Sequence, residues 1–237
     1  LGGSTSSSGF YRFKSWPEIL YEICDNDNLT IFNGAVEGYV SSQELIKLMR
    51  DIVWLNPDLV IVYDGHNDVA RNGAYNIFDI PYMSTIMEYA DRNIVKEAKT
   101  SGRSIFHGIP PLADVMGVWL KNIEYMHAVC EINHIKFLSF MQPSFFSKAK
   151  MISKEDIVTR KKWNCHFSSY IESLDIQLKE FRKAAPMISK SHDYIYDLTH
   201  IFDEEDVYMD NCHVYENGNK IIAQEIYKVI KGMIPGN

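Results

Sequence analysis

The chain has 237 residues, 46% of them hydrophobic, a length and balance typical of one globular domain rather than of a disordered or fibrous chain. Its 24 Lys and Arg residues against 31 Asp and Glu residues give a net charge of -7, and no run of basic residues could neutralise a phosphate backbone, so we expect no nucleic-acid partner. The longest apolar stretches fall far below the roughly 20 residues needed to cross a bilayer, so we expect no transmembrane segment.

The cysteines give a weak indication of compartment. Cys24, Cys130, Cys165 and Cys212 are scattered without a Cys-x-x-Cys pair or a zinc-like grouping, and a domain of this size does not need disulfides. The chain also begins at Leu1 without an initiator Met or a signal-peptide pattern. We therefore expect residues upstream of Leu1 to be missing, and a reducing compartment, the cytoplasm.

Short apolar runs rich in β-branched residues predict buried strands. Leu1 is expected as the last residue of a truncated first strand. The predicted strands that follow are Thr30 to Asn33, Leu59 to Tyr63, Ile135 to Met141 and Tyr194 to Leu198.

Between these strands, apolar residues recur every three or four positions, which predicts helices. The predicted helices are Trp16 to Cys24, Ser42 to Trp54, Met83 to Lys99, Val118 to Asn133 and Ser168 to Lys183. A last helix is expected after the turn residues Asn217 and Gly218. Its apolar residues, largely on one face, are Ile221, Ile222, Ile226, Val229, Ile230 and Met233.

Strands that alternate with helices predict a parallel sheet covered on both faces, the doubly wound α/β class. Residues 70–114 fit this pattern less well, since Ser104 to Ile109 could be a further strand or a loop ended by two prolines. No internal repeat or Gly/Ser-rich linker divides the chain, so we expect a single domain over residues 1–237.

In open parallel α/β sheets, the loops that leave the carboxyl ends of the strands share one edge, where ligands bind. The sequence places three small-residue loops there: Gly2 to Thr5, Gly34 to Gly38 and Gly65 to Asp68. Asp210 to His213 precedes the last helix, and in a turn-like conformation its two end residues lie close together. One carboxylate could then hold one imidazole beside these loops.

Four blocks in this order resemble the SGNH hydrolases, a family also described as GDSL-like lipases and acylhydrolases. The blocks are GGSTS from Gly2, NGAVEGYVSS from Asn33, DGHND from Asp64 and DNCH from Asp210. The first is similar to the family's Gly-Gly-Ser-Thr variant and lacks the Asp of its Gly-Asp-Ser form. Each block alone is a weak indication, but the four in order cover nearly the whole chain. The Gly-x-Ser-x-Gly elbow of ordinary α/β-hydrolases is missing around Ser4.

The resemblance implies a three-layer α/β/α, flavodoxin-like fold and a serine-based site. Ser4 would be the nucleophile, His213 its base and Asp210 the residue that orients the base. The oxyanion donors would be the backbone N–H groups of Ser4 and Gly38 and the side-chain amide of Asn67. Two segments that would vary with substrate specificity are 70–134 and 148–185.

Each of these residues also has a structural explanation. A serine in a Ser- and Gly-rich loop is usually a turn or cap residue, and Gly38 could simply permit a positive φ. Asn67 could shape its turn while Asp68 caps the following segment. His66, between Gly65 and Asn67, is a candidate for substrate contact, although this position varies in the family.

The sequence therefore predicts a serine esterase that removes a small acyl group, O-acetyl by preference, from a carbohydrate or similar polar acceptor through an acyl-serine intermediate. An acyltransferase, a lysophospholipase or a thioesterase would share the same triad, and a binding module that has lost activity is the alternative outside enzymes. No cofactor is required. Asp64, Asp68, His66 and His213 carry metal-ligating groups, but their spacing matches no common ligand motif, so we expect no metal.

Overall fold

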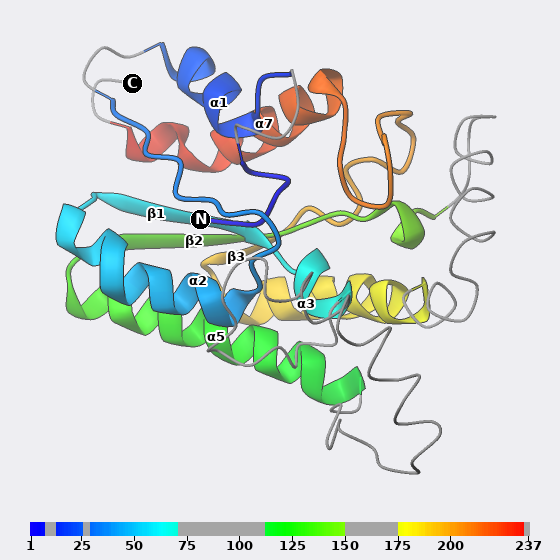
Figure 1. Cartoon of the computed structure of the whole chain (residues 1–237), viewed down its shortest axis with the longest axis horizontal. Helices are drawn as coiled ribbons and strands as arrows, with labels where there is room; N and C mark the ends of the chain where they lie inside the picture. Colours follow the sequence, from blue (N-terminus) through cyan, green and yellow to red (C-terminus); the bar gives the residue numbers. More distant parts are fainter. Residues whose placement is uncertain (8–12, 26–28, 71–111, 150–174, 235–237) are drawn as a thin grey trace, which may run out of the picture.

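The computed structural model describes residues 1–7, 13–25, 29–70, 112–149 and 175–234. At its centre lie three parallel strands in the order β1-β2-β3 (Figure 1). They are β1 (Leu59–Asp64), β2 (Lys136–Met141) and β3 (Ile195–Asp197). These strands confirm three of the predicted runs to within one residue at either end.

The three strands end level at one edge of the sheet. Asp64 of β1 pairs with Met141 of β2, which pairs in turn with Asp197 of β3. Five of the six residues of β2 are buried, as expected of a parallel strand covered on both faces. The segments that follow the three strands therefore leave from a common edge.

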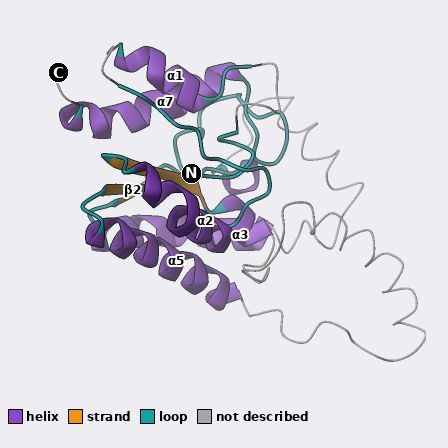
Figure 2. Cartoon of the chain, turned by 60° about the vertical axis from the view of Figure 1, so that its left-hand side comes forward, coloured by secondary structure: helices purple, strands orange, loops and turns teal. Residues whose placement is uncertain are grey.

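Helices cover both faces of this sheet (Figures 1 and 2). On one face, α1 (Trp16–Cys24) packs against α7 (Glu216–Ile230). On the other face lie α2 (Ser41–Lys47), α5 (Leu112–Ile132) and the helical residues 175–191. This arrangement confirms the predicted three-layer α/β/α fold.

The helix pattern explains how α5 joins the core. Its buried residues Trp119, Ile123, Met126 and Cys130 recur every three or four positions, so they share one face of the helix. The Trp119 ring meets the edge of Phe181, from residues 175–191, at a centroid distance of 5.2 Å. The two helices on this face therefore pack against each other as well as against the sheet.

Several predicted helix ends move. The segment predicted as Ser42 to Trp54 is α-helical only to Lys47 and continues as a π-helical turn (Leu48–Ile52) and a 3-10 turn (Val53–Leu55). The last helix, α7, begins at Glu216, because the amide of Asn219 already donates to the carbonyl of Tyr215 at 3.1 Å. The predicted turn residues Asn217 and Gly218 thus lie in its first turn. As predicted, Ile222, Ile226 and Ile230 form its buried face.

The prediction of a strand from Thr30 to Asn33 is wrong. On the edge of β1 opposite β2, the described residues offer only one isolated parallel bridge, between Gly2 and Tyr63. The described part of the chain offers residues 30–33 no neighbouring strand, and an extended segment without such a ladder is not a β-strand. β-Branched composition alone cannot reveal whether a partner strand is present.

The two segments that the sequence analysis expects to vary with substrate overlap helices of the fold. Residues 112–132 form α5, and residues 175–185 belong to a helix that continues to residue 191, so both stretches are part of the α/β/α layers. Residues 71–111 and 150–174 lie outside the described residues, and with them the predictions for Met83 to Lys99 and Ser104 to Ile109. Among the described helices, none has the length and apolar character that crossing a bilayer requires.

Candidate active site

The predicted site loops meet at the carboxyl edge of the sheet. The serine loop leaves from Gly2, beside the end of β1, and the amide of Val36 ties the next loop to it by donating to the Gly2 carbonyl at 3.0 Å. After Gly65, the expected loop is instead the short helix α3 (His66–Ala70), because the amide of Val69 donates to the Gly65 carbonyl at 3.2 Å. A 3-10 turn (Phe145–Ser147) follows β2 at the same edge.

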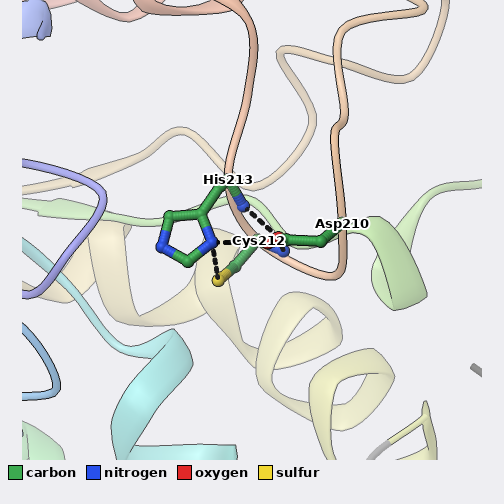
Figure 3. A group of neighbouring side chains, drawn as sticks. All are labelled: Asp210, Cys212 and His213. Atoms are coloured by element: carbon green, nitrogen blue, oxygen red, sulfur yellow. Dashed lines mark hydrogen bonds and ion pairs between the residues drawn. The ribbon is translucent and has the colours of Figure 1, made fainter. Parts of the chain in front are cut away.

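The structure brings Ser4, His213 and Asp210 into one hydrogen-bonded chain. The Ser4 Oγ lies 2.7 Å from Nε2 of His213, and Nδ1 of the same ring lies 2.7 Å from Oδ2 of Asp210. Figure 3 shows the His213 ring turned toward Asp210 within their shared loop. Because an ionised carboxylate only accepts hydrogen bonds, Nδ1 carries the proton and Nε2 accepts the hydrogen bond of the Ser4 hydroxyl.

A tight turn fixes the spacing of Asp210 and His213. The Oδ1 atom of Asp210 accepts from the backbone amides of Cys212 at 2.9 Å and His213 at 2.7 Å. An antiparallel bridge between Tyr208 and Val214 closes the loop around the turn. Burial opposes ionisation of Asp210, but its hydrogen bond and attraction to His213 and the two amides outweigh burial and lower the pKa of Asp210. The carboxylate therefore stays charged beside the imidazole.

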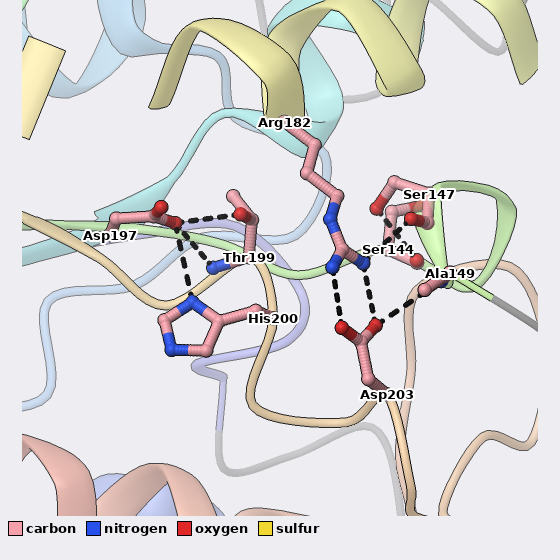
Figure 4. Close-up of polar contacts among 8 residues, drawn as sticks. All are labelled: Ser144, Ser147, Ala149, Arg182, Asp197, Thr199, His200 and Asp203. Carbon is pink, nitrogen blue, oxygen red and sulfur yellow. Dashed lines mark hydrogen bonds and ion pairs between the residues drawn. The ribbon is translucent and has the colours of Figure 1, made fainter. Parts of the chain in front are cut away.

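A second Asp-x-x-His sequence shows what distinguishes the first. His200 follows Asp197 by three residues, and the sequence analysis did not single it out. Its Nδ1 lies 3.9 Å from Oδ1 of Asp197, and 61% of its side chain is exposed. That oxygen accepts instead from the amide and hydroxyl of Thr199, at 2.8 and 2.6 Å (Figure 4). Spacing alone therefore does not create an oriented histidine.

Cys212 lies close to the His213 ring but is poorly placed as a rival nucleophile. Its Sγ is 3.6 Å from Nδ1, on the side of the ring that faces Asp210 rather than Ser4. Burial first, and then the charge of Asp210, raises the pKa of the thiol well above its ordinary value. A neutral thiol is a weak nucleophile.

Asp210, Cys212 and His213 are also the described residues that could hold a metal ion, with their ligand atoms within 4.8 Å of one another. A thiol binds metal as the thiolate, which the raised pKa of Cys212 disfavours. Asp210 and His213 meanwhile satisfy each other through a hydrogen bond. This donor set fits an oriented imidazole better than a metal centre.

Gly38 occupies a turn that requires its conformation. The amide of Tyr39 donates to the carbonyl of Val36 at 3.1 Å, and Gly38 has a φ of +75° at the third position of this four-residue turn. A positive φ at that position is typical of a type II turn and favours glycine. Among the described residues, the backbone amides of Ser4 and Gly38 donate to no acceptor.

Asn67 lies against the serine loop. Its Nδ2 donates to the carbonyl of Tyr39 at 2.8 Å, which uses one of the two N–H bonds of the amide. A Cβ atom built on Gly3 would lie only 2.5 Å from this nitrogen, so a side chain at position 3 would displace Asn67. Glycine at position 3 therefore permits a close approach between the Ser4 loop and the Asn67 amide.

One contact that was not predicted from the sequence ties the segment after Gly38 to α3. The buried Asp68 accepts hydrogen bonds from the amide and the hydroxyl of Ser41, the first residue of α2. Asn122 of α5 donates to the same hydroxyl at 2.9 Å. Burial raises the pKa of Asp68 to about 6, against the opposing effect of the Ser41 hydrogen bonds. The Asn-Asp pair in the third block was the available signal.

His66 is buried next to Asn211, the residue after Asp210, and only 3% of its surface is exposed. Its Nδ1 is 3.2 Å from the hydroxyl of Ser144, and its Nε2 is 3.3 Å from the side-chain nitrogen of Asn211. Burial is the main cause that lowers the pKa of His66 to about 4, with Asp210 raising it and His213 lowering it further. This position leaves no ring nitrogen for the substrate contact that the sequence suggested.

Comparison with solved structures identifies the fold. Axe2, an acetylxylan esterase from Geobacillus stearothermophilus, matches with a TM-score of 0.55 and 14% identity over 97% of this chain and 91% of its own. A lipase/acylhydrolase from Enterococcus faecalis matches with a TM-score of 0.53 and 17% identity over 100% and 95%. A Desulfitobacterium hafniense DCB-2 protein assigned to the lipolytic G-D-S-L family gives 0.54 and 14% over 97% and 96%. No protein-family model and no curated protein matches the sequence. The chain therefore has the SGNH hydrolase fold.

Proposed function

We propose that the chain is a serine ester hydrolase with Ser4 as its nucleophile. The observation that carries this proposal is the continuous chain from Ser4 Oγ to His213 Nε2 and from His213 Nδ1 to Asp210 Oδ2, with 2.7 Å at each contact. A serine hydroxyl becomes a useful nucleophile only when a neighbouring base accepts its proton. The two contacts supply that base and hold its tautomer.

The proposed reaction has two steps, the acylation and the deacylation of Ser4. Ser4 Oγ attacks the ester carbonyl while its proton moves to Nε2 of His213, and the tetrahedral intermediate collapses by breaking the ester C–O bond. The leaving alcohol takes the proton from Nε2. Water then attacks the acyl-serine carbonyl while Nε2 takes its proton; the acyl C–Oγ bond breaks, the acid leaves and the proton returns to Oγ of Ser4. Throughout, Asp210 stays ionised and stabilises the imidazolium.

The negative charge on the intermediate needs donors, and the serine loop, the turn at Gly38 and α3 each carry a candidate. The amides of Ser4 and Gly38 and the second N–H of Asn67 are the proposed oxyanion hole. Support comes from the proximity of Asn67 Nδ2 to Gly3 and from its bond to the Tyr39 carbonyl, next to Gly38. These groups are neutral, so they favour the charged intermediate over the neutral ester.

The substrate class rests on the similar structures. Axe2 is described as an acetylxylan esterase, and the Enterococcus faecalis structure as a lipase/acylhydrolase. For this chain we propose a small acyl group, acetyl, on a carbohydrate or similar polar acceptor. Turnover of p-nitrophenyl esters with two, four and eight acyl carbons, and acetate release from acetylated xylo-oligosaccharides, tests this choice. Fastest turnover with eight carbons and no acetate release would instead indicate a lipase.

The proposed chemistry uses only the protein's own groups, so EDTA should leave the rate unchanged. Loss of activity on chelation, restored by zinc or manganese, would show that the enzyme needs a metal.

For the compartment, we propose the cytoplasm on the ground of the cysteines. Cys24, Cys130 and Cys212, the cysteines that the structure describes, are free thiols.

A further inference from the structure

Three side chains behind the proposed triad come from three separate segments of the fold. His66 begins α3 after β1, Ser144 follows β2, and Asn211 lies in the turn between Asp210 and His213. His66 and Ser144 are 3% and 2% exposed, so water does not compete for their hydrogen bonds. The proposed reaction uses none of these three side chains.

The hydrogen bonds among them form a closed ring with one consistent set of directions. The Ser144 hydroxyl donates to the backbone carbonyl of Asn211 at 3.1 Å. Having used its single hydrogen, it must accept from Nδ1–H of His66 at 3.2 Å. Nε2 of the neutral ring is then an acceptor, and it faces the Asn211 side-chain amide nitrogen, a donor, at 3.3 Å. The ring holds both the backbone and the side chain of Asn211.

We propose that His66 is a positioning residue, which acts with Ser144 through Asn211 to hold the turn that places Asp210 and His213 against Ser4. This inference rests on the proposed function. A second contact supports it, because the amide of Phe145 also donates to the Asn211 carbonyl, at 3.0 Å. The turn is thereby attached to the segment that follows β2 and to α3.

The ring requires a neutral imidazole. A proton on Nε2 would point a second donor at the Asn211 amide and open the ring. Burial disfavours that proton and lowers the pKa of His66 to about 4. The charged groups that act on His66 are Asp210 and His213, which favour and oppose the imidazolium respectively. The positioning contacts therefore persist across the pH range in which a serine esterase works.

Two neutral substitutions of similar size separate positioning from mere packing. In His66→Leu both hydrogen bonds are lost, whereas in His66→Gln the side-chain oxygen can still accept from Asn211. We expect His66→Leu to lower kcat by up to about 100-fold, with little change in KM, because small misplacements of catalytic groups cost rates of this size. His66→Gln should recover part of the loss. Asn211→Ala should resemble His66→Leu, while the control Asn133→Ala, which also loses one side-chain hydrogen bond, at 2.7 Å to the Val129 carbonyl, should keep the wild-type kcat.

A nitrogen-15 NMR measurement on the imidazole of His66 needs no activity. Between pH 5.5 and 8, we expect one unchanging signal pattern with the proton on Nδ1, in both wild type and Ser4→Ala. An Nε2–H tautomer, or titration of His66 near pH 6.5, would show that the closed ring of hydrogen bonds does not form. Unchanged kcat in folded His66→Leu and Asn211→Ala would overturn its positioning role. Esterase activity that survives in Ser4→Ala would contradict the proposed function. It would not affect the conclusion about the tautomer of His66.

Discussion

Ser4 and His213 are 209 residues apart in the chain, yet 2.7 Å separates Oγ of one from Nε2 of the other. One residue follows the Leu1–Gly2 segment beside β1, and the other precedes α7. The contact therefore exists only when both ends of the chain are folded onto the same edge of the sheet. Activity should consequently depend on the intact fold and on the orientation of one imidazole.

Replacing His213 with Ala should abolish most ester hydrolysis, because it removes the only group placed to accept the Ser4 proton among the described residues. We expect kcat to fall by at least about 1,000-fold while the protein stays folded. His200→Ala is the matched control: it also removes a histidine three residues after an aspartate, but its Nδ1 lies 3.9 Å from that carboxylate. Steady-state kinetics and melting temperatures of both variants decide the matter. Equal activities in the two would show that His213 is not the base.

Asp210→Asn should reduce kcat less than His213→Ala does. The amide can still accept from the backbone amides of Cys212 and His213, so the turn should persist, but it cannot provide the negative charge beside Nδ1. We expect a loss on the order of 100- to 10,000-fold, since an amide at this place favours the wrong tautomer. The kcat of the folded variant is the measurement. Full activity would mean that another group orients His213.

Much of this geometry was predictable, and the remainder has identifiable causes. The strands and α7 follow from local hydrophobic patterns, and the order of the four blocks indicated which residues would meet. The prediction of a strand from Thr30 to Asn33 failed because a β-strand needs a neighbouring strand to pair with, and the local sequence does not reveal whether one is present. The hydrogen-bond partners of His66, which are 78 and 145 positions further along the chain, could not be predicted for the same reason.

Asn67→Ala should lower kcat far more than it raises KM. The amide is a neutral donor, which stabilises the developing oxyanion more than the ester, and removal of one such donor typically costs about 100- to 1,000-fold in kcat. The lost hydrogen bond to the Tyr39 carbonyl should cost only about 1 kcal/mol of stability. Kinetics and melting temperature should be measured on one preparation. A lower melting temperature with unchanged kcat would assign Asn67 a structural role alone.

The free energy of unfolding should depend on pH in a way that reflects the lowered pKa of His66. Its pKa in the folded state, about 4, lies below the unfolded value of 6.5, so the unfolded chain binds more protons between these two values. The stability contribution of the neutral ring is therefore complete above about pH 6.5 and is lost as the pH falls to 4. With about 1.4 kcal/mol for each pKa unit, the loss amounts to about 3 kcal/mol.

Comparison with His66→Gln isolates this contribution. Asp68, with its pKa raised to about 6, acts in the opposite direction over nearly the same range, but it is present in both proteins. Urea unfolding at pH 7.5 and pH 4 should show that the wild type loses about 3 kcal/mol more than the variant. Parallel losses in the two proteins would mean that His66 titrates normally in the folded state.

The most direct test of the central claim is covalent labelling of Ser4. A fluorophosphonate probe reacts with serines whose hydroxyl is activated by a base, so peptide mapping should locate one adduct on Ser4 in the wild type. Ser7→Ala, a neighbouring serine in the same loop, should be labelled and should hydrolyse p-nitrophenyl acetate like the wild type. Ser4→Ala should be folded, unlabelled and inactive. Labelling at another residue, or turnover near the wild-type rate in Ser4→Ala, would contradict the account.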